Sequence, residues 1–515
     1  MPARQRTTPT RTAPTVPTAG PGVELTDRRT RDAALVVLTA PADDDMWFGP
    51  GTAELPDHWR TWAEPTGKTG EVRTIPGAPG SAPGTVRWLA GIADRTRADW
   101  RAAGAALIRS IQDFDRADVS ARARRAVDIA LPPDVEPAEL GALVTGLRLG
   151  GYRFRLTADR TTEPRPRAIR LWLREPADGH RTELARAIAL TSATSLARDL
   201  ANMPSNIKDP AWLATVATRA ADDTPGLTAT VRDEHWLAEQ GFGGVLAVGA
   251  GSATPPRLIE LTWRPRGTPA APHLVLIGKG VTFDTGGISI KPADGMHMMR
   301  TDMSGAAAVI AALQGIARLG LPIRVTGLAP AAENHMGASA YRPGDVVRHV
   351  DGRTTEIANT DAEGRLLLAD ALAYAARRLR PDVMVDVATL TGAMKVSLGL
   401  RTGGFFATTD DLAKRIDAAG DAVGERWWRL PLLDDHVDDV RGDLADVKQC
   451  PPGPGGIAAA LFLREFTAGV PWAHLDIAGP ARSDKTYDEV VPGGTGFAAR
   501  TLIALAESFA TPELG

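Results

Sequence analysis

Short apolar runs alternate with amphipathic segments over the first third of the chain. Residues 33–39 and 168–173 are apolar runs typical of strands, and 152–156 alternates apolar and charged positions as a half-buried strand does. Segments 97–111 and 137–150 repeat their apolar residues at helical spacing. This alternation predicts a smaller N-terminal α/β domain over residues 31–180.

The remaining chain shows stronger strand signals. Apolar runs at 273–277, 323–328 and 383–387 each lead straight into glycine or polar residues, and helical patterns cover 183–200, 303–319, 364–379 and 456–468. Strands that end in polar loops are typical of open, largely parallel sheets. We therefore predict a larger C-terminal catalytic domain over 185–515, with a mixed, largely parallel sheet flanked by helices. The segments 158–168 and 174–182 are predicted to act as a hinge between the domains.

Composition limits the functional classes. The chain has 515 residues, 43% apolar and 23% charged, with a net charge of −3, so it carries no overall basic footprint for nucleic acid or anionic membrane. No apolar run is long enough to span a bilayer. Residues 1–30 are predicted to be a disordered tail rather than a transit peptide. A single cysteine, Cys450, fits a reducing, cytoplasmic setting, and we predict a structural or surface role for it.

Lysine is scarce in this sequence. Only eight of the 59 Lys and Arg residues are lysines, yet Lys279 and Lys291 stand twelve positions apart within one acidic stretch. An amine close to metal can lose its proton and act as a ligand, which a guanidinium cannot do. The two lysines therefore indicate chemistry that needs an amine.

The stretch around these lysines, residues 278–309, combines a strand, a glycine loop and a helix start. Asp284 lies in the loop that follows the strand, and Asp302 opens an alanine-rich helix. Gly286 and Gly287 permit a close or left-handed backbone path between Asp284 and Lys291. A phosphate loop is excluded, because the glycine and hydroxyl positions that it requires are not filled.

A second stretch, residues 359–366, carries Asp361, Glu363 and Arg365 at alternating positions just before a helix. Alternation in an extended segment directs the two carboxylates to one side. The helix start at Arg365 could hold an anion. Together with Asp284 and Asp302, these carboxylates would balance two divalent cations, and such a pair activates water for hydrolysis. Neither HExxH nor G-x-S-x-G occurs, which disfavours a zincin or a serine hydrolase.

These motifs resemble the leucyl aminopeptidase (cytosol aminopeptidase) family, the M17 metallopeptidases. The resemblance covers about 195–505 and is carried by ARDLANMPSN, GKGVTFDTGGISIKP, DMSGAAAV, RPGDVV, NTDAEGRL, DVATLTGA and HLDIAG. It implies a dinuclear enzyme that releases N-terminal amino acids, Leu and other apolar residues preferred, from peptides. It also implies a macro-like N-terminal domain and a homohexamer.

The resemblance implies a role for each matching residue. One metal would be bound by Lys279, Asp284, Asp302 and Glu363, and the second by Asp284, Asp361 and Glu363. The ions would be Mn²⁺ or Zn²⁺, with Mg²⁺ or Co²⁺ as alternatives. Lys291 would polarise the scissile carbonyl, and Arg365 would hold a bicarbonate ion that acts as general base. The side chain of the first substrate residue would contact Met299, Thr389, Leu390, Gly392, Ala478 and Ala481.

Two other functions fit the sequence less well than an aminopeptidase does. Some relatives resemble DNA-binding architectural factors, but the acidic overall charge and the lack of a dense basic patch disfavour such a regulatory role. A different two-metal hydrolase, such as a phosphatase or nuclease, is disfavoured by the missing phosphate loop and by Lys279 as an expected amine ligand. Ala481 is small where some members of the family carry Met, so the side-chain subsite is expected to be wide.

Overall fold

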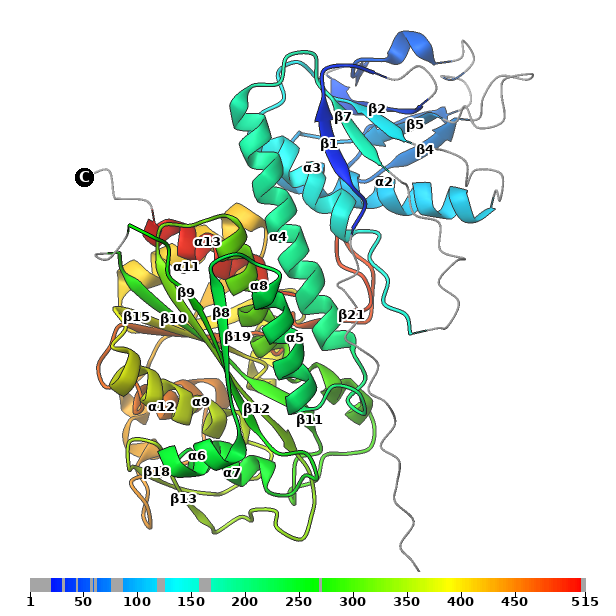
Figure 1. The fold of residues 1–515 in the computed structure, drawn as a ribbon. Coiled ribbons are helices and arrows are strands. Elements are labelled where there is room, and N and C mark those ends of the chain that lie inside the picture. Colours follow the sequence, from blue (N-terminus) through cyan, green and yellow to red (C-terminus); the bar gives the residue numbers. More distant parts are fainter. Residues whose placement is uncertain are drawn as a thin grey trace, which may run out of the picture. The chain divides into compact units, whose positions relative to one another are not determined.

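The computed structural model describes residues 20–29, 33–42, 45–55, 59, 63–75, 87–117, 126–156, 168–267 and 271–510. The chain divides into two compact units (Figure 1). The small unit comprises Ala19–Ser195 and Ser483–Thr495, and the large unit comprises Leu196–Arg482 and the chain from Gly496 onward. Both units contain a sheet with flanking helices, which confirms the predicted two-domain α/β fold class.

The sheet of the small unit has the strand order β1-β7-β6-β2-β5-β4, with β3 beside β2. The pairs from β1 to β5 along this order are parallel, and β3 and β4 run antiparallel to their neighbours. Helices α2 (Arg97–Ala117) and α3 (Pro137–Leu149) pack on each other. The strands are β1 (Val23–Thr26), β2 (Ala34–Ala42), β3 (Asp45–Phe48), β4 (Val72–Ile75), β5 (Arg87–Gly91), β6 (Val127–Ala130) and β7 (Ile169–Trp172).

Both faces of this sheet are buried. Val36 and Leu38 belong to one apolar cluster, while Leu35 and Val37 belong to another. Successive residues of a strand point to opposite faces, so the unbroken apolar run at 33–39 reflects a central strand that is covered on both sides. The predictions of a strand at 33–39, a strand at 168–173 and helices at 97–111 and 137–150 are confirmed.

Two segments of the small unit differ from the predictions. Val23–Thr26 were predicted to lie in a disordered tail but form the edge strand β1, which pairs with β7. The prediction failed because this apolar run is short and has polar residues on both sides. Residues 152–156 have no regular structure, so the strand predicted there is wrong. Their alternation imitates a half-buried strand, but Leu156 is exposed and no described strand pairs with the segment.

The sheet of the large unit has the strand order β17-β16-β19-β15-β10-β12-β9-β8, with β11 beside β12. Its central strands β19, β15, β10 and β12 are parallel, and antiparallel pairs lie toward the edges. The three strands predicted in this region are confirmed as the adjacent strands β15, β10 and β12. The bounds are β8 (Leu227–Arg232), β9 (Arg257–Trp263), β10 (His273–Gly278), β11 (Gly280–Asp284), β12 (Arg324–Asn334), β15 (Val383–Ala388), β16 (Thr402–Ala407), β17 (Arg426–Arg429) and β19 (Trp472–Asp476).

Helices cover both faces of the large sheet (Figure 1). One layer contains α5 (Pro210–Asp222), α8 (Ser304–Arg318), α11 (Asp410–Val423) and α13 (Ala499–Ala510), and the other contains α6 (Glu234–Gln240), α7 (Gly243–Gly249), α9 (Gly364–Tyr374) and α12 (Gly455–Arg464). The predicted helix at 364–379 ends at Tyr374 and continues as a π-helical turn over Ala375–Leu379. The prediction for 456–468 is too long at its end, because Ala468 and Gly469 have positive φ angles that an α-helix cannot accept.

Helix α4 (Asp178–Asn202) belongs to both units, since the division between them falls at Leu196. The predicted hinge at 174–182 is therefore wrong over 178–182, where α4 already begins, and most of the other predicted hinge, 158–168, lies outside the described residues. The domain boundaries drawn at 180 and 185 stay predictions. Among the residues that the structure describes, no helix combines the length and the apolarity needed to cross a membrane.

Candidate active site

The candidate site lies beyond the ends of the central strands of the large sheet. Lys279 follows β10, and Asp284 is the last residue of β11. Asp302 connects the 3₁₀ helix η3 (Met296–Thr301) to the start of α8, while Asp361 and Glu363 immediately precede α9. Because ligands bind beyond the carboxyl ends of parallel strands, these segments occupy the position where a site is expected.

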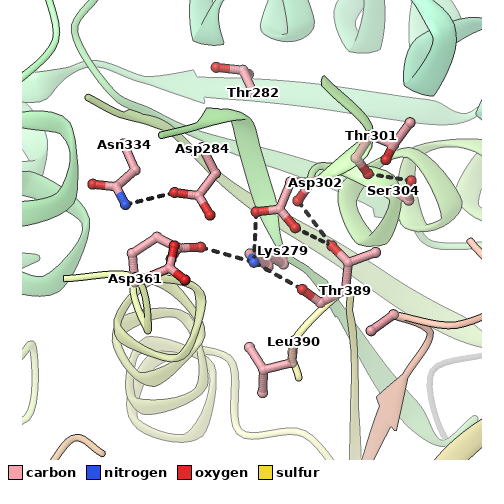
Figure 2. A network of polar contacts seen from close by, with 12 residues as sticks. Lys279, Thr282, Asp284, Thr301, Asp302, Ser304, Asn334, Asp361, Thr389 and Leu390 are labelled. Carbon is pink, nitrogen blue, oxygen red and sulfur yellow. Dashed lines mark hydrogen bonds and ion pairs between the residues drawn. The ribbon is translucent and has the colours of Figure 1, made fainter. Parts of the chain in front are cut away.

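Lys279 stands at the centre of a polar network (Figure 2). Its Nζ lies 2.8 Å from Asp302 Oδ2 and 2.9 Å from Glu363 Oε1, and it donates a hydrogen bond of 3.0 Å to the carbonyl of Thr389. Burial alone would lower the pKa of this lysine, but the charges of Asp302 and Glu363 outweigh that effect and raise it. Lys279 therefore holds its proton as long as carboxylates are its only partners.

Lys291 approaches the same carboxylates from the glycine loop. Its Nζ lies 2.7 Å from Asp284 Oδ2 and also contacts the carboxylate of Asp361. The loop returns on itself at Gly286 and Gly287, whose φ angles are +87° and +65°. The Gly286 amide donates to Asp284 Oδ1 at 2.8 Å, so the loop also fixes the orientation of that carboxylate. This positive-φ path agrees with the backbone role predicted for the two glycines.

The acidic residues form one crowded group. Asp284, Asp361 and Glu363 can each offer an oxygen such that all three atoms lie within 4.8 Å of one another. Burial, followed by the charge of Asp284, raises the pKa of Glu363 to about 8. Burial likewise raises the pKa of Asp302 and of Asp361. The raised pKa values mean that the site holds its carboxylates in the charged form at a considerable electrostatic cost.

The donor set fits divalent metal ions. Asp302 Oδ2, Asp361 Oδ1 and Glu363 Oε1 are buried, and each of them has a lysine as its charged contact. Buried carboxylate oxygens of this kind are suited to hard divalent cations. A lysine among them can add one nitrogen ligand, provided that the metal ion displaces a proton from its ammonium group.

Several uncharged groups hold this arrangement in place. Asn334 donates from Nδ2 to Asp284 Oδ1 at 2.8 Å and to the carbonyl of Thr360 at 3.0 Å. Thr389 donates from Oγ1 to Asp302 Oδ1 at 2.7 Å, and the Tyr341 hydroxyl donates to the carbonyl of Thr360 at 2.9 Å. Asn334 and Tyr341 escaped the sequence analysis, because nothing in their surroundings separates them from ordinary core polar residues.

A cavity of about 490 Å³ opens beside this cluster. The structure brings all of the predicted site residues to its wall except Glu363, which contacts Lys279 on that wall. They are Lys279, Asp284, Lys291, Met299, Asp302, Asp361, Arg365, Thr389, Leu390, Gly392, Ala478 and Ala481. Four of the five predicted metal ligands and the predicted side-chain subsite therefore share one cavity.

Comparison with known proteins shows which family the chain belongs to. The sequence profile described as "Cytosol aminopeptidase family, catalytic domain" matches residues 195–503. The chain belongs to this family. The match begins at the boundary of the large unit and contains every predicted site residue, and it gives no support to the DNA-binding alternative.

Relatives within the cytosol aminopeptidase family are similar over most of their length. A probable cytosol aminopeptidase from Chlorobaculum tepidum is 42% identical over 436 residues, which are 82% of this chain and 86% of the relative. One from Roseiflexus castenholzii is 46% identical over 375 residues, or 71% of this chain and 76% of the relative. This extended similarity supports an aminopeptidase hydrolase.

A solved structure of similar fold is the bottromycin maturation enzyme BotP in complex with Mn. It superposes with a TM-score of 0.81 at 39% identity, and the match covers 94% of this chain and 100% of that structure. A second structure of the same enzyme gives a TM-score of 0.80 at 40% identity, covering 93% and 99%. The Mn in the first structure belongs to that protein, and it points to divalent metal as the class of ion to test here.

Arg365, which the family resemblance assigns to an anion, is buried at the start of α9. Its guanidinium donates to the carbonyl of Gln449, while its Nε has no hydrogen-bond partner among the described residues. Burial lowers the pKa of Arg365. Cys450 is close to it and lines the same cavity, and the structural or surface role predicted for this cysteine stays a prediction.

Lys208 is a site-supporting residue that the sequence analysis missed. Its buried Nζ donates to the carbonyls of Leu200 at 3.0 Å and of Ala201 at 3.4 Å, and it contacts the carbonyl of Arg300. Burial lowers the pKa of Lys208 well below its ordinary value. The side-chain nitrogen of Lys208 thereby joins the last turn of α4 to η3, which leads into Asp302. The scarcity of lysine that drew attention to Lys279 and Lys291 applies equally to Lys208.

Proposed function

We propose that this member of the cytosol aminopeptidase family is a dinuclear metal-dependent aminopeptidase that releases the N-terminal residue of peptides. The convergence of Asp284, Asp361 and Glu363 on one point, with Lys279 and Asp302 in contact, is the observation that carries the proposal. Lys279, Asp284, Asp302 and Glu363 would hold one ion, and Asp284, Asp361 and Glu363 the other. Mn²⁺ and Zn²⁺ are the first ions to test, with Mg²⁺ and Co²⁺ as alternatives. When bound, two divalent ions would lower the pKa of a water molecule and supply the hydroxide for hydrolysis.

The residues of the chain would then position and stabilise the substrate. Lys291 now satisfies Asp284 and Asp361, and metal would take over those carboxylates and leave its ammonium group facing the cavity. In that position the group would stabilise the oxyanion that forms when the peptide carbonyl is attacked. Arg365, with its unpartnered Nε, would hold a bicarbonate ion as the base that removes the proton from water.

The cavity wall suggests which peptides enter. Met299, Leu390, Ala478 and Ala481 supply apolar surface around the cavity, Gly392 also lines it, and Thr389 lies beside Lys279 and Asp302. Such a wall accommodates Leu and other apolar side chains of the first residue. The carboxylates would hold the free amino group of the peptide, directly or through metal, which limits release to one residue at a time.

Assembly and location are part of the same proposal. We propose a homohexamer and a cytoplasmic location, both on family resemblance, with no role for nucleic acid or membrane. Native mass spectrometry measures the first directly, and a monomeric mass at working concentration would rule it out. Cell fractionation tests the second.

The decisive experiment is hydrolysis of leucine p-nitroanilide after chelation and after return of Mn²⁺ or Zn²⁺. We expect metal to restore activity in the wild type and not in Glu363→Gln, whose neutral amide removes one ligand charge. Glu425→Gln is the matched control, because Glu425 is a similarly buried carboxylate that accepts hydrogen bonds from Thr501 and from the amide of Ala498 and does not line the cavity. Full activity of the chelated protein, or of Glu363→Gln, would overturn the dinuclear mechanism.

A further inference from the structure

Two cations of the cavity wall have no part in the proposed hydrolysis. Lys395 lies on α10 (Gly392–Leu398) and is exposed, and Arg482 follows Ala481 and is half-buried. Neither side chain has a hydrogen bond or an ion pair with any residue that the structure describes. The other cations of the wall differ in this respect, since Lys279 and Lys291 face carboxylates and Arg365 donates to a backbone carbonyl.

Both cations adjoin the subsite that is proposed for the first side chain. Lys395 follows Gly392 by three positions, which places the two residues on one face of α10. Arg482 comes directly after Ala481, and both residues line the cavity. The two segments also lie side by side, because a Cβ added to Gly479 would stand 2.3 Å from the carbonyl oxygen of Gly399, just beyond α10.

A buried carboxylate fixes these segments to each other. Asp476 accepts hydrogen bonds from the amides of Leu390, Thr391 and Ala478 at 3.0–3.1 Å, and from the Thr391 hydroxyl at 2.6 Å. The stretch before α10 and the stretch before Arg482 are thus held by one side chain. Lys395 and Arg482 therefore belong to two segments that one side chain links, which favours the action of both cations on one ligand group.

Charge in the occupied site favours an anionic ligand. Two divalent ions would balance Asp284, Asp302, Asp361 and Glu363, so the cations of the wall would no longer be offset by carboxylates. A cavity whose walls carry charge of one sign raises the local concentration of ligands of the opposite sign. Arginine in particular binds carboxylates through paired hydrogen bonds.

We propose that Lys395 and Arg482 bind the side-chain carboxylate of an acidic first residue, glutamate in particular, so that the enzyme releases acidic as well as apolar N-terminal residues. The proposal rests on the aminopeptidase function proposed above. The apolar wall contacts the methylene groups of glutamate, and the cations receive its carboxylate. Aspartate is shorter and reaches them less well.

The test compares the p-nitroanilides of glutamate, glutamine and leucine with the full-length protein and Mn²⁺. Glutamate and glutamine have the same shape and differ in charge, so the ratio of their kcat/KM values isolates the carboxylate. We expect the wild type to favour glutamate over glutamine by about tenfold, and Lys395→Met/Arg482→Met to bring this ratio close to one. Raising the ionic strength should lower the wild-type ratio, because the cations are not deeply buried.

Lys414→Met serves as the control, since Lys414 is an exposed lysine on α11 that does not line the cavity and has no partner among the described residues. It should keep the wild-type ratio, and circular dichroism melting curves check the folding of all variants. An equal ratio in wild type and double variant overturns the proposal, even when leucine is hydrolysed and the aminopeptidase function stands. The proposal also fails if the variants instead impair the dipeptide Leu-Gly more than Leu-Gly-amide, because the cations would then serve the peptide's terminal carboxylate. No hydrolysis of any of the three anilides would remove the proposed function itself.

Discussion

In the small unit a buried acid has a base of its own, whereas one group of acids in the large unit crowds together around shared lysines. Asp128 is fully buried on β6, and Arg170 on β7 donates from Nε to its Oδ1 at 2.7 Å. Glu489 is paired in the same way with Arg101 at 3.1 Å. In the large unit, Asp284, Asp361 and Glu363 crowd together, and they form the one group of three or more acidic, histidine or cysteine ligands found in the described part of the chain.

The contrast shows that buried carboxylates in the same fold class can serve either stability or ligand binding. A carboxylate that has its own arginine is satisfied by the protein alone, and its contribution is to stability. Carboxylates that share too few cations are satisfied only by something that comes from outside, such as metal. Both sheets are largely parallel and covered by helices, so the architecture does not decide which use is made.

The largest effect is expected for Lys291→Met, which tests whether the carboxylates of the large unit serve catalysis. Removing the ammonium group should lower kcat/KM for leucine p-nitroanilide by roughly 10²- to 10³-fold, because the oxyanion loses its charged partner. Metal content, measured by atomic absorption, should stay at the wild-type level, since the carboxylates remain. An unchanged kcat would show that Lys291 only neutralises Asp284 and Asp361, as a structural cation does.

His474→Gln tests a pair in the large unit in which, as in the small unit, one buried acid is paired with one base. His474 Nδ1 lies 2.6 Å from Asp386 Oδ1, and both side chains are fully buried. Burial works against the charged imidazole, but Asp386 outweighs it and raises the pKa of His474. Because the folded-state pKa exceeds the unfolded one, the stabilisation is complete below the ordinary histidine pKa and is lost as the pH rises through the raised value.

We therefore expect His474→Gln to cost about 3 kcal/mol of unfolding free energy at pH 6 and clearly less at pH 9. Urea unfolding of wild type and variant at both pH values measures the difference. A penalty that does not change with pH would mean that the imidazole is neutral and that the pair acts as an ordinary hydrogen bond.

Asp128→Asn tests the small unit. The amide keeps the shape of the carboxylate but leaves Arg170 without its opposite charge, which should lower the unfolding free energy by about 2 kcal/mol. Because Asp128 takes no part in the carboxylate group of Asp284, Asp361 and Glu363, kcat/KM per folded molecule should not change. Thermal melting measures the loss of stability, and the anilide assay measures the activity. A loss of activity greater than the loss of folded protein would show that the small-unit pair also serves catalysis.

The smallest effect is expected at an exposed pair, Arg342 and Asp345. Their side chains are 70% and 31% exposed and lie 3.1 Å apart. Water competes for such a pair, so Arg342→Ala should change the unfolding free energy by less than about 0.5 kcal/mol. A larger shift in the melting temperature would indicate that exposed charges matter more here than the contrast between buried groups implies.

Much of this organisation is accessible from the sequence. The strands β10, β12 and β15 are central and buried on both faces, so they leave unbroken apolar runs, and their polar ends mark the site. The residues of the cavity could be named because they lie within continuous motifs. Asn334 and Lys208 could not, because their roles arise from contacts made across the fold with Asp284 and Arg300. The edge strand β1 was missed for a related reason, since only its pairing with β7 identifies it.

Cys450 has a practical consequence. It is the only cysteine of the chain, it is partly exposed, and it lines the cavity. A thiol-reactive fluorophore or spin label would therefore attach at one known position without any engineering of the protein. Its signal would change as a peptide enters and as the released amino acid leaves, which makes individual steps of turnover observable by stopped-flow spectroscopy.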